Sequence, residues 1–272
     1  MELLEYNDLE NIIYAEPFSG GFGAGLELLF NGKIRKAIIN DFDIAIYSIW
    51  YAVLNETERF VQDILKTRIT INEWQKQKEI YETYKTNDAY LYELAFATYF
   101  LNRTNVSGII TGGPIGGINQ EGNYKLDSRF NKKNLAEKIV EISKWKGKIE
   151  LYNLEANEFI NQILLSYLAE EVFIFFDPPY YEQGKNLYTN FFEHEDHVSL
   201  KNQINLLSDY SWILTYDYQE EISNIYEDYS QYLYNINYSA NKVRKANELL
   251  IHSDCVKVKS LDKVIIHELV TA

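Results

Sequence analysis

The sequence predicts an α/β fold: a doubly wound sheet interrupted by a mostly helical segment. Two observations lead to this prediction. Short apolar runs typical of buried strands alternate with helical patterns along the chain, and one interval between consecutive strands is far longer than a crossover needs. The composition favours a folded protein, because 46% of the 272 residues are hydrophobic and 15% are aromatic.

Each element follows from a local pattern. Apolar, β-branched Ile12-Ile13-Tyr14-Ala15 predicts a buried strand, and the glycines of 19–25 end it before a helix at 26–30. Ala37-Ile38-Ile39 predicts the second strand, which ends at Asn40-Asp41. Similar runs predict strands at about 149–152, 172–176, 212–216 and 249–252. Apolar residues at helical spacing predict helices at about 44–54, 72–85, 89–102, 155–167 and 195–207, and a last hairpin is expected over about 256–269.

The long interval lies between the second strand, which ends near Asn40, and the third, which begins near Ile149. A strand-to-strand crossover commonly takes about 30 residues. We therefore expect a helical insertion domain at 56–148. The main domain is then formed by 1–55 and 149–272.

The charge of the chain is unevenly distributed. There are 26 Lys+Arg against 40 Asp+Glu, and the net charge of −14, taken alone, argues against a nucleic-acid partner. Yet residues 101–148 hold nine basic and four acidic residues (+5), and 242–263 hold six and three (+3), so the rest carries −22. Two basic islands on an acidic body resemble the footprint of an anionic ligand, although a solvated helix face is the alternative for 138–148.

Several other classes of protein are excluded. The single cysteine, Cys255, excludes an internal disulfide and a cysteine-cluster zinc site. No apolar run approaches the roughly 20 residues that span a bilayer, and the acidic N-terminus is not a signal peptide. His194 and His197 are expected to open a solvated helix rather than to bind a metal. We expect a cytoplasmic protein without a metal site.

A first candidate site is the turn Glu16-Pro17-Phe18-Ser19-Gly20-Gly21 after the first strand, together with Asp41 at the end of the second. Glycines let the backbone approach a ligand closely, and an acid at the second strand end can accept both hydroxyls of a ribose. The pattern predicts a nucleoside cofactor. A purely structural turn is the alternative.

A second candidate site is Asp177-Pro178-Pro179-Tyr180, directly after the buried run 172–176. An acid at the carboxyl end of a central strand lies where open α/β sheets bind ligands. The Asp177 carboxylate and the Pro178 carbonyl form a pair of acceptors suited to an amino group, and the Tyr180 ring can stack on the base that carries it. The alternative is a rigid turn that ends the strand.

With these motifs, the sequence resembles the adenine-specific, Dam-like DNA methyltransferases over nearly its whole length. The segments similar to the family are 15–21, 99–105, 111–117, 177–180, 239–244 and 248–251. Their order (cofactor motif, recognition insertion, catalytic motif) is that of the Dam-like subgroup.

The resemblance implies a Rossmann-like methyltransferase sheet and S-adenosylmethionine as cofactor. It implies cofactor contacts at Glu16, Pro17, Phe18, Gly20 and Gly21 around the methionine half, Asp41 on the ribose, Glu155 near the adenine, and Asp177. The implied reaction is in-line methyl transfer to the 6-amino group of a flipped adenine, with Asp177, Pro178, Pro179 and Tyr180 as the catalytic residues.

The resemblance also implies double-stranded DNA as the partner and a restriction endonuclease as a candidate partner protein. The candidate DNA contacts are Arg103, Thr104, Asn105, Lys125, Arg129 and Lys132. RNA as the substrate stays open from these motifs.

The N-terminus departs from the family. Its members begin with a Gly-Gly-Lys-type segment that completes the cofactor pocket, whereas none of the eleven residues before Ile12 matches it. We expect that another chain supplies the segment, that it has been lost from this sequence, or that it is dispensable. The alternative function is a non-catalytic, methyltransferase-like DNA-binding subunit without a complete cofactor site. A nucleotide-dependent oxidoreductase is a further alternative, which leaves Asp177-Pro178-Pro179-Tyr180 unexplained.

Overall fold

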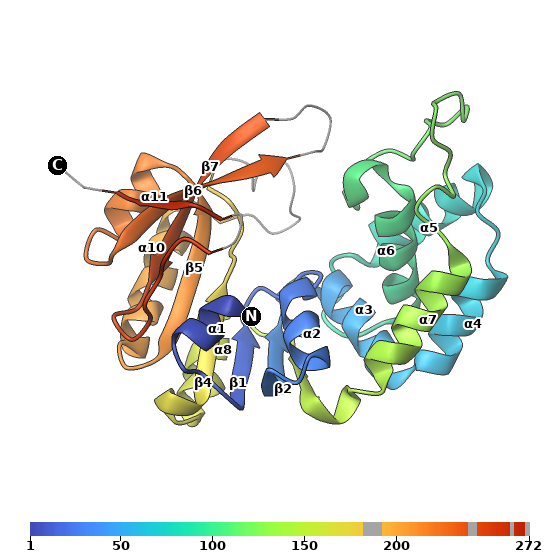
Figure 1. Ribbon diagram of the computed structural model, residues 1–272. Helices are drawn as coiled ribbons and strands as arrows, with labels where there is room; N and C mark the ends of the chain where they lie inside the picture. Colours follow the sequence, from blue (N-terminus) through green and yellow to red (C-terminus); the bar gives the residue numbers. More distant parts are fainter. Residues whose placement is uncertain (182–191, 239–243, 262–263, 270–272) are drawn as a thin grey trace. The chain divides into compact units, whose positions relative to one another are not determined.

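The computed structural model of the protein describes residues 1–181, 192–238, 244–261 and 264–269 (Figure 1). The chain forms two compact units: unit 1 comprises Met1–Asp41 and Leu154–Ala272, and unit 2 comprises Phe42–Asn153. Ser239 and Ala240 of the similarity segment 239–244 lie outside the described residues, as do Asp262 and Lys263 of the expected hairpin. None of the helices in the described ranges has the length and apolar character needed to cross a membrane.

Unit 1 is built on a sheet in which the strands follow one another in the order β2-β1-β4-β5-β7-β6-β8. The strands are β1 (Ile12–Glu16), β2 (Ile34–Asn40), β4 (Val172–Phe176), β5 (Ser211–Asp217), β6 (Gln231–Tyr238), β7 (Arg244–His252) and β8 (Ile266–Glu268). The pairs β1–β2, β1–β4 and β4–β5 are parallel, whereas β5–β7, β6–β7 and β6–β8 are antiparallel. β1 is buried along its whole length, as expected for a strand inside a parallel sheet. The predicted α/β fold is confirmed.

The order of the parallel strands reverses at β1. The chain passes from β1 to β2 on one side and later returns to β4 on the other side. Figure 1 shows β1 and β2 in blue next to β4 in yellow, although β4 lies much further along the chain. Open α/β sheets bind ligands at such a reversal, at the carboxyl ends of the strands. Glu16 ends β1 and Asp177 directly follows β4, so both predicted motifs lie at this switch point.

The helices of unit 1 are short. They are α1 (Glu2–Tyr6), α2 (Gly23–Phe30), α8 (Ala156–Gln162), α10 (His194–Ile204) and α11 (Glu220–Ile225), with 3-10 turns η3 (Leu164–Ser166), η4 (Ala169–Glu171) and η5 (Asn205–Leu207). The helix expected over 155–167 ends early, because the chain tightens into η3 after Gln162.

The C-terminal strands differ from the prediction. β6 was not expected, because Gln231–Tyr238 alternates apolar and polar residues instead of forming the continuous apolar run that marks β1 and β4. The hairpin expected over 256–269 is wrong as a pair of strands, and an antiparallel bridge between Leu261 and Val264 is the part of it that forms within the described residues. Residues 256–260 form no strand, and β8 pairs with β6.

Unit 2 is mostly helical. Its elements are α3 (Ile44–Asn55), α4 (Thr57–Lys66), α5 (Ile71–Tyr84), α6 (Tyr92–Thr104), η1 (Val106–Gly108), α7 (Lys132–Ser143), η2 (Lys146–Lys148) and β3 (Ile149–Tyr152). Side chains of Thr70 and Asn131 accept the backbone N–H groups of Glu73 and Asn134, and these caps start α5 and α7. The helices enclose an aromatic core that includes Trp74, Tyr81, Phe96, Phe100 and Phe130.

The boundaries of the two units differ from the predicted domain boundaries: unit 2 comprises Phe42–Asn153, whereas the insertion was predicted at 56–148. The helix at 44–54 was predicted to belong to the main domain, whereas Ile44, Ala45, Ala52 and Val53 of α3 belong to the helical core of unit 2. At the other end, unit 2 extends to Asn153 and so includes β3. The strand count used to place the boundaries contains no information about which core buries a helix.

Candidate functional site

The carboxyl of Glu16 is buried at the end of β1. Its side chain is 5% exposed, the Tyr14 hydroxyl donates to its Oε1 over 2.7 Å, and the backbone N–H of Gly25 also donates to it. Burial raises the pKa of Glu16 to about 8, and the charge of Asp177 adds to the effect. The structure therefore brings Glu16 and Asp177 within electrostatic range, and Glu16 is mostly protonated at neutral pH.

The glycine-rich turn after β1 is held to the end of β2. The backbone N–H of Gly20 donates to Asp41 Oδ2 over 2.9 Å. Gly20 has a φ of +45°, in the left-handed region that favours glycine. Gly20 and Gly21 are exposed, and a Cβ atom on either would meet no atom of the described residues within 4 Å. The surface above the turn is thus open to a ligand, with the Asp41 carboxylate beside it.

Asn40 joins three chain segments at this point. Its side-chain amide donates to the carbonyls of Pro17 and Leu154, each over 3.0 Å, and accepts the N–H of Leu154 over 2.9 Å. The backbone carbonyl of Asn40 also accepts the N–H of Ser19 over 2.9 Å. Only 1% of Asn40 is exposed. Asn40 was not predicted as a site residue from the sequence, because its partners lie far apart along the chain.

Two further predicted cofactor residues have partners within the protein. The Phe18 ring packs edge-on against Phe192, with the ring centroids 5.8 Å apart. Glu155 caps α8, because its Oε2 accepts the N–H of Asn157 over 2.7 Å and that of Glu158 over 3.4 Å. One carboxylate oxygen of Glu155 is therefore already used by the helix.

Asp177 lies at the second strand end of the switch point. The Thr215 hydroxyl, on the neighbouring β5, donates to Asp177 Oδ1 over 2.9 Å. The residue keeps an exposed surface, yet the protein atoms around its carboxyl raise the pKa to about 6, and the charge of Glu248 adds to this shift while the Thr215 bond opposes it. Asp177 is ionised at neutral pH but titrates close to it.

The turn after Asp177 is held by side chains from other strands. The Tyr180 hydroxyl donates to Glu248 Oε1 over 3.1 Å, and the backbone N–H of Tyr181 donates to Asp217 Oδ1 over 3.1 Å. Pro178 is buried, whereas Pro179 and Tyr180 are partly exposed. Asp177 through Tyr180 thus form a braced turn whose tyrosine ring is still partly accessible.

The two histidines of α10 differ from each other. His194 is exposed, as expected for a solvated helix, but His197 is fully buried. Its Nδ1 lies 2.8 Å from the Tyr216 hydroxyl, and burial lowers the pKa of His197 to about 4. The expectation of a solvated face is therefore wrong for His197, which packs below the turn, 5.2 Å between ring centroids from Tyr181.

In unit 2, Thr104 and Asn105 are fully buried. The Thr104 hydroxyl donates to the Phe100 carbonyl over 2.8 Å. The Asn105 amide donates to the carbonyls of Ile109 and Ile110 over 2.9 and 2.8 Å, and its Oδ1 accepts Trp74 Nε1 over 2.6 Å. This burial is inconsistent with the predicted direct DNA contacts by these two side chains. The Asn105 bonds instead shape the loop after α6, whereas the Thr104 hydroxyl bonds within α6.

Arg103, in the last turn of α6, and Arg129, just before α7, lie close together. Both Nε and Nη2 of Arg103 donate to Asn102 Oδ1, over 3.1 and 2.8 Å, and Asn102 Nδ2 donates to the Gly108 carbonyl over 3.0 Å. Arg129 Nη1 donates to the Asn105 carbonyl over 3.4 Å, and partial burial together with the Arg103 charge lowers the pKa of Arg129. Two neighbouring guanidinium groups form a local concentration of positive charge.

Lys125 and Lys132 are engaged in local bonds. Lys125 Nζ donates to the Gln120 carbonyl over 2.5 Å, on an exposed part of the loop. Lys132 Nζ donates to the Leu65 carbonyl at the end of α4 over 2.9 Å. Lys132 therefore also satisfies a helix end, as basic side chains commonly do.

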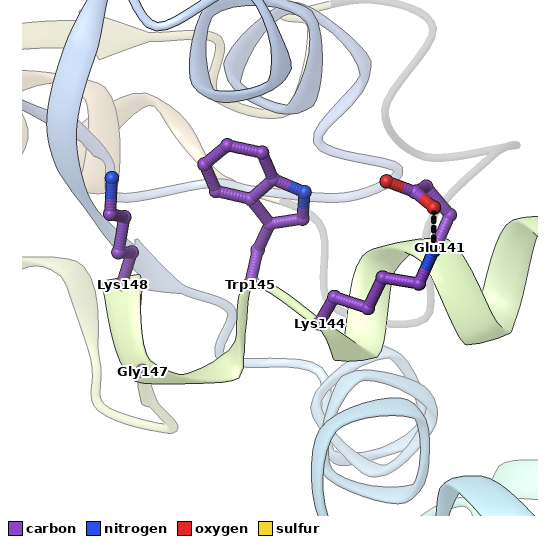
Figure 2. A pocket seen from close by; sticks show the side chains of 5 residues that line it. All are labelled: Glu141, Lys144, Trp145, Gly147 and Lys148. Atoms are coloured by element: carbon purple, nitrogen blue, oxygen red, sulfur yellow. Dashed lines mark hydrogen bonds and ion pairs between the residues drawn. The ribbon is translucent and has the colours of Figure 1, made fainter.

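The lysine-rich segment after α7 surrounds a tryptophan. A surface pocket there is lined by Glu141, Lys144, Trp145, Gly147 and Lys148 (Figure 2). Lys144 Nζ is paired with Glu141 Oε2 at 2.5 Å, as the dashed line in Figure 2 marks, and Lys148 Nζ lies 5.1 Å from the Trp145 ring centre. These contacts and the negative end of the α7 dipole explain why lysines gather here, so no bound ligand is needed to explain them.

Comparisons with known proteins identify the family of the chain. The D12 class N6 adenine-specific DNA methyltransferase family matches residues 3–247 of the chain. The Type II methyltransferase M.MjaIII of Methanocaldococcus jannaschii is 27% identical over 202 residues, which cover 69% of this chain and 66% of that protein. The Type II methyltransferase M.CviBI of Paramecium bursaria Chlorella virus NC1A is 22% identical over 199 residues, or 70% and 67%. The match thus spans about two thirds of each relative's length.

Among solved structures, the rRNA methyltransferase AviRa of Streptomyces viridochromogenes is similar to the chain at 10% identity and a TM-score of 0.38, with 90% of this chain and 78% of that chain covered. A likeness at this level carries no argument about substrate or mechanism.

Proposed function

The chain belongs to the D12 class N6 adenine-specific DNA methyltransferases, and we propose from this premise that it transfers a methyl group from S-adenosylmethionine to the 6-amino group of a flipped adenine in double-stranded DNA. The observation that carries the proposal is the meeting of two acidic strand ends at the switch point. Glu16 ends β1, and Asp177 follows β4 on the adjacent strand. The Glu16 carboxyl suits the ammonium group of a cationic cofactor, and the Asp177 carboxylate suits the amino group of the target base.

The residues at the switch point fit S-adenosylmethionine, which carries an ammonium group and a ribose. The buried carboxyl of Glu16 would hold the ammonium end, the open backbone of Gly20 and Gly21 would line the methionine half, and Asp41 would accept the ribose hydroxyls. Glu155 would lie near the adenine with the oxygen that does not cap α8. When bound, the cofactor supplies an electrophilic methyl group.

The turn 177–180 would act on the target base. The amine is a poor nucleophile because its lone pair is delocalised into the ring. Hydrogen bonds from its two N–H groups to the Asp177 carboxylate and the Pro178 carbonyl would favour a tetrahedral nitrogen with a localised lone pair. Tyr180 would stack on the extruded base and hold it in line with the methyl group. The nitrogen loses one proton in the reaction, and Asp177 is placed to pass it to solvent.

We propose that Arg103, at the end of α6, and Arg129, just before α7, contact the DNA. No ion pair joins either guanidinium to a carboxylate within the described residues. Two adjacent guanidinium groups without an acidic partner suit phosphate oxygens. Lys125 and Lys132 would add charge nearby, while the buried Asn105 would hold the loop after α6 in shape. A restriction endonuclease would be the functional partner of such an enzyme.

The direct test is methyl transfer. Purified protein is incubated with labelled S-adenosylmethionine and genomic DNA that lacks N6-methyladenine, and the digested DNA is analysed for the modified base. We expect N6-methyladenine with the wild-type chain and none with Asp177→Ala, whose fold is checked by thermal unfolding. RNA serves as the competing substrate.

The alternative of a non-catalytic subunit makes a different prediction. Calorimetry with S-adenosylmethionine would then detect no binding by the isolated chain, and DNA would stay unmodified. Binding of the cofactor together with retained transfer by Asp177→Ala would instead overturn the assigned mechanism.

A further inference from the structure

Glu248 is a buried acid at the centre of the antiparallel part of the sheet. It lies on β7, opposite Asp217 of β5 and opposite Tyr234 of β6. Only 2% of it is exposed. The cofactor and catalytic motifs do not include it, and no role was assigned to it from the sequence.

The carboxylate of Glu248 joins two tyrosines from different parts of the chain. The Tyr180 hydroxyl donates to Oε1 over 3.1 Å, and the Tyr234 hydroxyl donates to Oε2 over 2.9 Å. Tyr234 is its cross-strand neighbour, so that bond lies within the sheet. Tyr180 belongs to the turn after β4, so the other bond ties the catalytic turn to β7.

A buried carboxylate is expensive to hold, because burial removes it from water, and an apolar side chain of similar volume often gives equal or greater stability. Stability alone therefore does not explain an acid at this position. Hydrogen bonds to a carboxylate are shorter and stronger than those between neutral groups. Such a bond holds the far end of the tyrosine side chain in place. Because a phenolic O–H prefers to lie in the plane of its ring, the direction of the bond also favours one ring orientation, although the terminal torsion is otherwise broad.

We propose that Glu248 is a positioning residue that fixes the plane of the Tyr180 ring for stacking on the target adenine. The proposal rests on the proposed function, since it requires an adenine in front of Tyr180. Glu248 acts through the Tyr180 hydroxyl and does not touch the substrate. Tyr234 bonds to the second carboxylate oxygen of Glu248 and leaves the first to Tyr180.

The test is a double-mutant cycle on methyl transfer to genomic DNA that lacks N6-methyladenine. The variants are Glu248→Leu, Tyr180→Phe, the double variant, and Glu248→Gln, which keeps an oxygen acceptor. We expect Glu248→Leu to lower kcat about 10- to 100-fold, the range that misplacement of a bound group causes, with an unchanged KM for S-adenosylmethionine. Glu248→Gln should recover most of the loss. In the Tyr180→Phe background, Glu248→Leu should have little further effect, because the bond it removes is already absent.

Tyr234→Phe is the matched control. It removes the other bond to Glu248 and leaves the Tyr180 bond in place, so Glu248→Leu should keep its full effect in that background. Cofactor affinity by calorimetry and the thermal midpoint show that each variant is folded. If Glu248→Leu does not fold, Tyr180→Phe alone must show the loss of kcat.

Three results overturn the proposal. They are wild-type kcat in Glu248→Leu, wild-type kcat in Tyr180→Phe, and losses from the two changes that multiply fully in the double variant. Each of these concerns Glu248 alone. Absence of transfer by the wild-type chain would instead overturn the proposed function and the role of Glu248 together.

Discussion

The hydroxyl of Thr215 donates a hydrogen bond to Oδ1 of Asp177 over 2.9 Å, from the strand next to the one that Asp177 follows. This bond stabilises the charged form of a carboxyl whose pKa burial raises to about 6. Thr215 thereby keeps Asp177 in the form that accepts hydrogen bonds from an amine.

The pH dependence of the reaction should report this carboxyl. We expect kcat/KM to fall as the pH decreases through about 6, because protonation of Asp177 removes an acceptor. Thr215→Val removes a bond that favours the carboxylate, so the acidic limb should move to higher pH. Thr215→Ser keeps the hydroxyl and should leave the limb in place. pH–rate profiles measure the limb, and an unmoved limb in Thr215→Val would show that Asp177 is not the titrating group.

Binding of S-adenosylmethionine should release a proton. The pKa of Glu16 is about 8 in the free protein, so Glu16 is mostly protonated at pH 7. A cationic group placed beside it favours the carboxylate, and the affinity should therefore rise with pH up to about 8. Calorimetry at pH 7 in buffers of different ionisation enthalpy counts the protons. Glu16→Gln should bind more weakly and release none, and equal proton release in both proteins would contradict the assignment.

Asn40→Ala should weaken both the fold and cofactor binding. The change leaves the carbonyls of Pro17 and Leu154 without their buried donor, which typically costs about 1–3 kcal/mol for each group. Urea unfolding measures the free energy of unfolding, and calorimetry measures the affinity for S-adenosylmethionine. Asn161→Ala is the control, because the Asn161 amide makes its bonds on an exposed surface. Equal losses of unfolding free energy and cofactor affinity from the two changes would show that the buried bonds of Asn40 contribute no more than exposed ones.

The salt dependence of DNA binding should identify the phosphate contacts. If Arg129 neutralises one phosphate, Arg129→Gln should reduce the slope of log K against log salt by about 0.9. Lys133→Gln is the control from the same basic segment, because the Lys133 side chain is 84% exposed and its only ion-pair partner among the described residues, Glu137, lies 3.9 Å away. Fluorescence anisotropy with duplex DNA gives the slopes. The same change in slope for both variants would indicate diffuse attraction rather than a contact.

The buried strands of the fold were predictable, and the outer ones less so. Val172–Phe176 is a continuous apolar run because nearly all of its residues are buried, as in strands covered on both faces of a parallel sheet. Its bounds agree with the prediction. β6 has water on part of its surface, so polar residues interrupt its pattern. The helix α3 was assigned to the wrong core, since its spacing indicates an apolar face but not what the face packs against.

The site was predictable where its residues lie in one short motif. Glu16 and Asp177 end predicted strands, and the resemblance to a family placed both in the cofactor and catalytic motifs. Asn40, Thr215 and Glu248 escaped prediction because each acts through a partner from another strand, and single-sequence patterns contain no pairing information. Asn105 was expected at the surface on the basis of its motif, but its amide bonds are internal.

The amide of Asn40 also joins the two segments of unit 1 where the chain leaves this unit and returns to it. Asn40 and Leu154 hold each other through two hydrogen bonds, and all 112 residues of Phe42–Asn153 lie between them along the chain. Segments whose two ends meet in this way can be exchanged without opening the host fold. A different helical domain could thus be grafted between these residues, so the inserted unit and the sheet that carries the two strand-end motifs could evolve separately.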